Sequence, residues 1–369
     1  MPSELEIKLD RLSRFLDRHK LDGVLLTRRD NFAWITCGKD NHIANNTPMG
    51  VASILATRES RVCLASTIEA PRIRAEELAG TGVEMIDFPW YDPDAKEKRV
   101  SDILAGRTIA TDGETFGGLP LSALPPDFSD LRWSLTVEEI ARYRDCGSRA
   151  SRAMEETCRQ LKTGMTGHDI AGVLDHHIHS EELNPLVTLV AVDDQITRFR
   201  HPIPKSIPMR KHAMLVTCCA MGGLIACVTR FVHVGAIPSE LKAKQQAICN
   251  IDAAVNLATR PGRTLGEIFD DLTRAYADNG YADQWKLHHQ GGSTGYNPRD
   301  MVATPGNGVR VVENQAFAWN PSIVGAKSED TVLVTSKAIE LLTAPSKEWP
   351  KVMGKSSFGE LERADILVI

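Results

Sequence analysis

Leucines recur near the start of the chain at the three- and four-residue spacing of an amphipathic helix, with charged residues between them: Leu5, Leu9, Leu12 and Leu16. This spacing predicts a helix over residues 4–19. Short apolar runs at 23–27, 51–57 and 61–66 are typical of buried strands, and helix patterns alternate with strand patterns after them. Strands that alternate with helices predict an α/β N-terminal domain over residues 1–128.

The Pro-rich stretch 119–130 predicts a linker, and residues 129–369 are expected to form one α+β domain. Thr136 has Glu139 three residues later, which is the pattern of a capping box and predicts a long helix to about residue 161. Apolar runs predict strands at 186–192, 213–219, 225–235, 317–323 and 330–335. Helix patterns cover 238–259 and 264–279.

Two segments of the second domain are similar to each other. Residues 162–177 and 260–275 each contain a glycine turn, a threonine, and then an acidic residue and an isoleucine at the start of a helix. Either the likeness is that of helix starts in general, or a helix-turn-helix-strand unit is duplicated. The second interpretation would pack the strands of both copies around one central site.

Composition narrows the class of protein. The 369 residues suffice for two domains, and 42% hydrophobic with 25% charged residues is typical of a globular protein. The net charge of -5 gives no reason to expect a nucleic acid or an acidic membrane as partner. The charged N-terminus lacks the apolar segment of a secretory signal, and no apolar run reaches the ~18 residues of a membrane span. Eight scattered cysteines without a C-x-x-C pair indicate reduced thiols in a cytoplasmic protein.

Six motifs resemble those of the creatinase / aminopeptidase P / prolidase superfamily and occur in the same order along the chain. They are LRWSLTVEEIARYR (131–144), MTGHDIA (165–171), FRHPIP (199–204), VTRFVHVG (228–235), RPGRTLGEI (260–268) and KSEDTVLVT (327–335). The resemblance implies a "pita-bread" C-terminal domain with an internal pseudo-twofold repeat, preceded by an α/β N-terminal domain. It also implies a homodimer in which a loop of one N-terminal domain, here near Asn41 and His42, closes the partner's active site.

Peptidases of this superfamily hold two divalent metals with two Asp, one His and two Glu. By the resemblance, these ligand positions fall near Thr217 and on Cys227, Gly292, Asn320 and Glu329. Glu329 alone keeps the ligand type, and one carboxylate cannot hold two hard cations. We therefore expect no metal and no cofactor. A rebuilt zinc site is an alternative, although buried cysteines are usually small hydrophobes and no zinc-like spacing occurs: Cys218, Cys219, Cys227, His288 and His289.

Creatinase is the family's precedent for catalysis without metal. Its catalytic histidine resembles His201 here, and a glutamate that helps to bind its cationic substrate resembles Glu329. Histidine is the natural proton shuttle near pH 7. The alternatives are that His201 caps a turn before prolines, and that Glu329 pairs with a nearby Lys or Arg such as Arg230.

Neutral polar residues replace the metal ligands in the expected pocket: Cys227, Thr229, Ser293 and Asn320. His288 and His289 begin a Gly-rich segment, and strand alternation predicts that one of them faces the pocket. Arg299 takes the position of a second catalytic histidine of the peptidases, where a guanidinium suits a substrate carboxylate.

These patterns predict a metal-independent hydrolase that cleaves a C–N bond of a small amino-acid-like substrate. His201 would move protons, Glu329 would orient water or the substrate nitrogen, and Arg299 would bind a carboxylate. The alternatives are a catalytically inactive pseudo-peptidase used for binding or scaffolding, a lyase on the same pocket, and an Xaa-Pro-type metallopeptidase.

Overall fold

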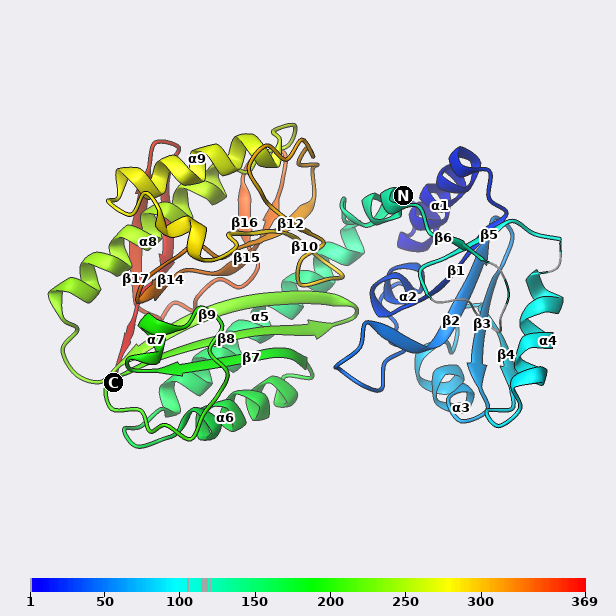
Figure 1. Cartoon of the computed structure of the whole chain (residues 1–369), viewed down its shortest axis with the longest axis horizontal. Coiled ribbons are helices and arrows are strands. Elements are labelled where there is room, and N and C mark those ends of the chain that lie inside the picture. The colour runs from blue at the N-terminus through cyan, green and yellow to red at the C-terminus, as the bar shows by residue number, and fades with distance from the viewer. Residues whose placement is uncertain (1, 105, 114–118, 120) are drawn as a thin grey trace. The chain divides into compact units, whose positions relative to one another are not determined.

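A computed structural model describes residues 2–104, 106–113, 119 and 121–369. The chain divides into two compact units (Figure 1), one of Met1–Arg132 with Thr136–Glu139 and the other of Trp133–Leu135 with Ile140–Ile369. The elements of the first unit are α1 (Glu4–His19), β1 (Gly23–Arg28), α2 (Arg29–Ile35), β2 (Met49–Thr57), β3 (Arg61–Ser66), α3 (Ala70–Arg72), the π-helix Ile73–Glu77, β4 (Glu84–Phe88), α4 (Pro93–Leu104), β5 (Ile109–Thr111), β6 (Ser122–Ala123) and the 3₁₀-helix Pro126–Arg132.

The first unit is built on a mixed sheet in the order β4-β3-β2-β1-β5-β6. Helix α4 contributes Val100 and Leu104 to a core with Leu25, Leu55 and Leu64 of the sheet. The α/β architecture predicted from the alternation of strands and helices is confirmed. Thr136 and Glu139 form the predicted capping box, because each backbone N–H donates to the other residue's side chain, at 2.8 and 3.2 Å.

The Pro-rich stretch is not a free linker, which corrects the prediction for 119–130. Residue 120 lies outside the described residues, but β6 pairs with β5 at the edge of the sheet. The ring of Phe128 meets those of Phe15 and Trp34 edge-on, at 5.1 and 5.6 Å between centroids. A buried aromatic ring removes apolar surface from water, so this segment stays with the first unit.

The side chain of Asn41 is bonded within its own unit. Its side chain is fully buried and its amide donates to the carbonyl oxygens of Ala52 and Thr27, at 2.7 and 3.1 Å. His42 is bound to Asp40 of the same loop. Both residues that suggested a contact across a dimer thus have partners within their own unit, and the dimer stays a prediction.

The second unit contains α5 (Val137–Gln160), α6 (Gly167–Ser180), β7 (Asn184–Val192), α7 (Gln195–Arg198), β8 (His212–Met221), β9 (Leu224–His233), α8 (Ser239–Ala258), α9 (Leu265–Asp278), the 3₁₀-helix Gln284–Leu287, β10 (Gly291–Thr294), β11 (Met301–Val302), β12 (Gln315–Trp319), β13 (Ser322–Ile323), β14 (Ala326–Lys327), β15 (Asp330–Val334), β16 (Ile339–Leu341), β17 (Lys351–Ser356), β18 (Gly359–Ala364) and β19 (Leu367–Val368). Its main sheets run in the orders β19-β9-β8-β7 and β11-β10-β12-β15-β16. The two sheets meet at β9 and β15, where the N–H of Thr229 donates to the carbonyl of Glu329 at 3.1 Å.

Matched contacts confirm the internal duplication. Thr166 caps α6 in a box with Asp169, and Thr264 caps α9 in a box with Glu267. Each threonine also forms an isolated bridge to a loop that follows its helix, Thr166 to Pro208 and Thr264 to Arg310. A glycine in the turn before each helix makes an equivalent hydrogen bond. The N–H of Gly164 donates to the carbonyl of Met209, and the N–H of Gly262 donates to the carbonyl of Val311, both at 2.8 Å.

A buried network of charges joins the elements of the second unit. Asp330 on β15 accepts from Arg230 on β9 at 2.9 Å and from Arg363 on β18 at 2.8 Å. Arg363 also reaches Asp252 on α8 at 3.0 Å. These side chains balance one another's charges in the core, as buried ions must. Arg230 therefore pairs with Asp330 and not with Glu329.

The buried imidazole of His212 should make the protein labile to acid. Burial lowers the pKa of His212 to about 4 from its ordinary 6.5, while its ring bonds to the carbonyl of Val232. The unfolded chain takes up this proton as the pH falls below 6.5, but the folded chain does not until about pH 4. We expect His212 to remove about 3 kcal/mol of unfolding free energy across this interval.

Urea unfolding at pH 7, 5.5 and 4 measures this loss. His212→Gln does not titrate there and should make the curve less steep, whereas His176→Gln, at an exposed position of α6, should leave it as in the wild type. Parallel curves for the wild type and His212→Gln would contradict the prediction.

Candidate functional site

Two cysteines lie side by side where the strands of the two sheets meet. Cys218 on β8 is opposite Cys227 on β9. The backbone of Cys227 turns away from β8, since its N–H donates to the hydroxyl of Thr331 at 2.7 Å and its carbonyl accepts from that hydroxyl at 3.1 Å. Such a non-hydrogen-bonded pair brings its side chains close together. Thr217 points to the other face of the strand, so Cys218 takes the position that the resemblance placed near Thr217.

The thiol of Cys227 is held between a hydrogen-bond donor and a cation. The hydrogen bond with Cys218 and the charge of Arg299 lower the pKa of Cys227, against the opposing effect of burial. Nη1 of Arg299 lies 3.3 Å from Sγ of Cys227. Arg299 thus stabilises negative charge on this sulfur, as a metal ion stabilises a coordinated anion.

Glu329 is bound through both of its carboxylate oxygens. Oε1 accepts from Nη2 of Arg299 at 2.8 Å, and Oε2 accepts from Nζ of Lys327 and from Oγ1 of Thr229, both at 2.7 Å. Burial alone would raise the pKa of Glu329, but the two cations and the hydroxyl lower it to about 2. Glu329 is therefore ionised at neutral pH, and it pairs with Lys and Arg as the alternative interpretation held.

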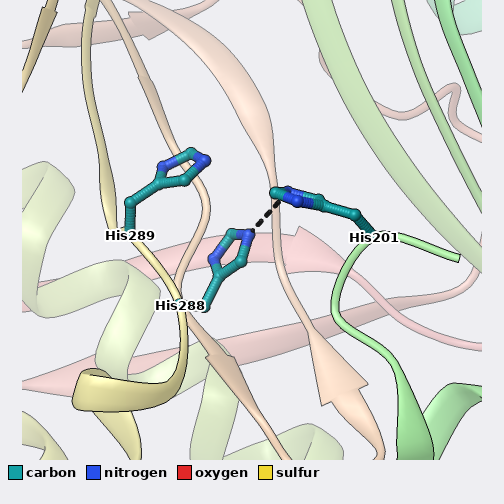
Figure 2. Close-up of side chains that lie close together, drawn as sticks. All are labelled: His201, His288 and His289. Carbon is teal, nitrogen blue, oxygen red and sulfur yellow. Dashed lines mark hydrogen bonds between the residues drawn. The ribbon is translucent and has the colours of Figure 1, made fainter.

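Three histidines gather next to this ion cluster (Figure 2). Nε2 of His201 lies 3.0 Å from Nε2 of His288, and the rings of His288 and His289 stack at 4.4 Å between centroids. The ring of His201 is 5.7 Å from that of His289. The prediction that only one of His288 and His289 faces the site is wrong. Both precede strand β10, so the alternation of a strand does not apply to them.

The site keeps these imidazoles neutral. Burial and the charge of Lys327 lower the pKa of His288 to about 3, and burial and Arg299 lower that of His289 to about 4. Burial and Lys327 lower the pKa of His201 as well. The ion cluster and the histidines thus share one electrostatic environment.

Further residues chosen from the sequence are buried near the same strands. Ser293 lies on β10, and Asn320 follows β12, which pairs with β10. Oγ of Ser293 and Oδ1 of Asn320 are buried without a hydrogen-bond partner in the part of the chain that the structure describes.

Lys327 is the functional residue that sequence reasoning missed. Its side chain is almost fully buried, and its ammonium group forms an ion pair with Glu329. The available signal was its position two residues before Glu329 in a strand-like segment, since residues at i and i+2 share a face of a strand.

A profile of metallopeptidase family M24 matches residues 141–336, which is more than half of the chain. The chain belongs to metallopeptidase family M24. This membership confirms the predicted superfamily and its pita-bread fold, and it places the chain among peptidase-type hydrolases. Within the described part of the chain, no helix is both long and apolar enough to cross a membrane.

Individual relatives are distant. An uncharacterized peptidase of Staphylococcus saprophyticus is 20% identical over 357 residues, with 92% of this chain and 100% of the relative covered. The X-Pro aminopeptidase of Thermotoga maritima MSB8 has the same fold, with a TM-score of 0.76 and 17% identity over 98% of this chain and 99% of that one. The N-terminal domain of the FACT complex subunit SPT16 from chickpea (Cicer arietinum) matches with a TM-score of 0.68 and 14% identity, over 93% of this chain and 97% of that one.

The two-metal centre of the M24 peptidases does not fit these side chains. Thiols replace carboxylates at Cys218 and Cys227, and the oxygens of Glu329 already bind two cationic side chains. A Cβ on Gly292 would lie 2.0 Å from the carbonyl oxygen of Met301, so no histidine fits there. A pair of hard cations needs several charged oxygens, which this donor set lacks.

The cysteines and histidines that suggested a mixed zinc site are not brought together in the described part of the chain. Cys219 points away from the Cys218–Cys227 pair, toward the carbonyl of Ala226. Within the described residues, a cluster of three or more potential metal ligands occurs only at His201, His288 and His289.

Proposed function

We propose that this M24 member is a metal-independent hydrolase of a C–N bond in a small amino-acid-like substrate that carries a carboxylate. The observation that supports this most directly is the ion cluster, in which Arg299 and Lys327 bind Glu329 where the family's metals would lie. The side chains of Arg299 and Lys327 would supply the positive charge that metal ions supply in the family's peptidases. Two cations against one carboxylate leave a positive balance that suits an anionic group of the substrate.

His201 would be the proton shuttle. Pro202 and Pro204 restrict the backbone of its segment, which fixes the point from which its side chain enters the site. The ring is neutral at pH 7 because its pKa is lowered, and it can therefore accept a proton. It would take a proton from water as the oxygen attacks the substrate carbon, and give a proton to the nitrogen as the C–N bond breaks. His288, 3.0 Å away, would orient the ring.

Glu329 would act as a positioning residue. With Arg299, Lys327 and Thr229 bound to it, its carboxylate holds the two cations in fixed directions. Nε of Arg299 is buried without a partner among the described residues, and the Lys327 ammonium has donors beyond the one that Glu329 takes. These donors would bind the substrate carboxylate.

Arg299→Gln tests the carboxylate role. We expect KM to rise about 10- to 100-fold with a smaller change in kcat, because a hydrogen bond to a charged group contributes ~1.5–3 kcal/mol. The same substrate with its carboxylate converted to a neutral amide provides the control. The wild type should discriminate between acid and amide, and the variant should not. Equal discrimination by both would remove Arg299 from this role.

The test of the proposed function is turnover after exhaustive chelation. Release of amine or amino acid would be followed over a panel of Xaa-Pro dipeptides, other dipeptides, and N-amidino and N-carbamoyl amino acids. We expect activity in the metal-free protein on at least one of these. Activity that appears only when a divalent metal is added would identify an M24 metallopeptidase of the ordinary kind and overturn the proposal.

A second candidate is a binding or scaffold protein. The match to a domain of a FACT complex subunit supports it, because a protein described as part of a complex has the same fold. Absence of turnover on the whole panel, with or without metal, would favour this candidate.

We also expect a homodimer, as the family resemblance implies. Sedimentation equilibrium at micromolar concentration should give about twice the 40.6 kDa chain mass. A stable species of one chain mass would contradict it.

A further inference from the structure

We propose that His201, His288 and His289 form a binding site for one borderline transition-metal ion such as Zn²⁺. One nitrogen from each imidazole lies within 4.8 Å of those of the other two. Figure 2 shows the rings turned toward one another, with His288 and His289 on one segment and His201 on another. None of the three occupies a position that the family resemblance assigns to a metal ligand.

The ligand type and the spacing suit zinc. Three imidazoles with an open fourth position are a common zinc arrangement, and Zn–N bonds of ~2.0–2.1 Å place the nitrogens about 3.3 Å apart. The Nε2 atoms of His201 and His288 are 3.0 Å apart, close to that separation. His201 is exposed, so its ring can rotate to complete the set.

Few hydrogen bonds would be lost when an ion binds. Nδ1 of His288 is buried without a partner among the described residues, so Nε2 makes this ring's only hydrogen bond there, to His201. An ion would replace this single bond with bonds to both rings. One hydrogen bond opposes binding of an ion, because the N–H of Gly291 donates to Nδ1 of His289 at 3.3 Å. Binding through Nε2 of His289 would break this long bond, which is weak at that distance.

The neighbouring charges set what else the ion would bind. Lys327 acts on all three rings and Arg299 on those of His201 and His289, and Glu329 offsets only part of their charge. This environment opposes a bare dication and favours one that carries hydroxide or another anion in its fourth position. The ion would also take the lone pair that His201 needs as a base. The inference therefore goes beyond the proposed function, and the loaded protein should be inhibited.

Binding is measured directly, without an activity assay. Chelator-stripped protein is titrated with ZnCl₂ in a calorimeter, and with CoCl₂ in a spectrophotometer. We expect one ion per chain and a Co²⁺ spectrum without thiolate-to-cobalt charge transfer. Cys218→Ser/Cys227→Ser should bind as the wild type does. His288→Ala/His289→Ala should bind at least about 100-fold more weakly, since even outer-shell partners contribute 10- to 100-fold.

The matched control is His176→Ala/His177→Ala. These residues are another adjacent pair, with ring centroids 5.3 Å apart on α6, and their loss should leave binding unchanged. If the His288/His289 variant does not fold, exposed His201→Ala must also weaken binding. Three results would each overturn the proposal: no binding by the wild type, undiminished binding by the histidine variants, or loss of binding in the cysteine variant.

Discussion

Replacing His201 with alanine should lower turnover by ~10²–10⁴-fold, which is the usual contribution of a general acid or base. The unfolding free energy should change by less than about 0.5 kcal/mol, because an exposed side chain away from the core contributes little to stability. His201 is exposed, and its contacts are with the rings of His288 and His289. Turnover and urea unfolding are measured on the same preparation.

His176→Ala is the control, since it removes an exposed histidine of helix α6. If His201→Ala keeps normal turnover and unfolds more easily, His201 is a structural residue, and the proton shuttle must be sought at His288 or His289.

Glu329→Gln should lower the unfolding free energy by ~3–5 kcal/mol, the cost of breaking a buried ion pair by removing one partner. Glutamine keeps the size of the side chain but leaves Arg299 and Lys327 buried without their counter-ion. The double variant Lys327→Met/Glu329→Gln should recover part of the loss, because one of the two uncompensated charges is removed with its partner. Urea unfolding of the single and double variants measures both effects.

The matched control is Glu340→Gln. Glu340 also binds an arginine through both oxygens, at 2.7 and 2.8 Å from Arg144, but the pair lies at the surface. Surface pairs contribute ~0–1 kcal/mol, so this variant should be nearly as stable as the wild type. Equal losses of unfolding free energy in the two variants would show that burial does not increase the contribution of the Glu329 ion pairs to stability.

The fold could be predicted where the deciding interactions are local. Thr166 with Asp169 and Thr264 with Glu267 are three residues apart, so the sequence itself contains both capping boxes and indicates the repeat. The Pro-rich segment was misjudged because its place depends on Phe128 packing against Phe15, which lies more than a hundred residues away. The composition of residues 119–130 alone does not indicate such a distant contact.

The residues of the candidate site could also be predicted only in part. The resemblance selected Cys227, Thr229, Arg299 and Glu329, and the structure brings them into contact. The resemblance assigns no role to Lys327, and the local signal for it was its position two residues before Glu329. The contact of His201 with His288 joins residues 87 positions apart, and strand alternation wrongly separated His288 from His289.

The ion cluster would compete with a metal ion for any carboxylate that is introduced beside it. Cys227→Asp would introduce one carboxylate of the family's ligand set, yet it would lie beside the guanidinium that binds the sulfur at 3.3 Å. It would form a salt bridge with Arg299 before it could attract a cation. A histidine at position 292 would clash with the backbone of Met301. Neither substitution by itself would therefore give this site the charged oxygens and the imidazole that a pair of metal ions needs.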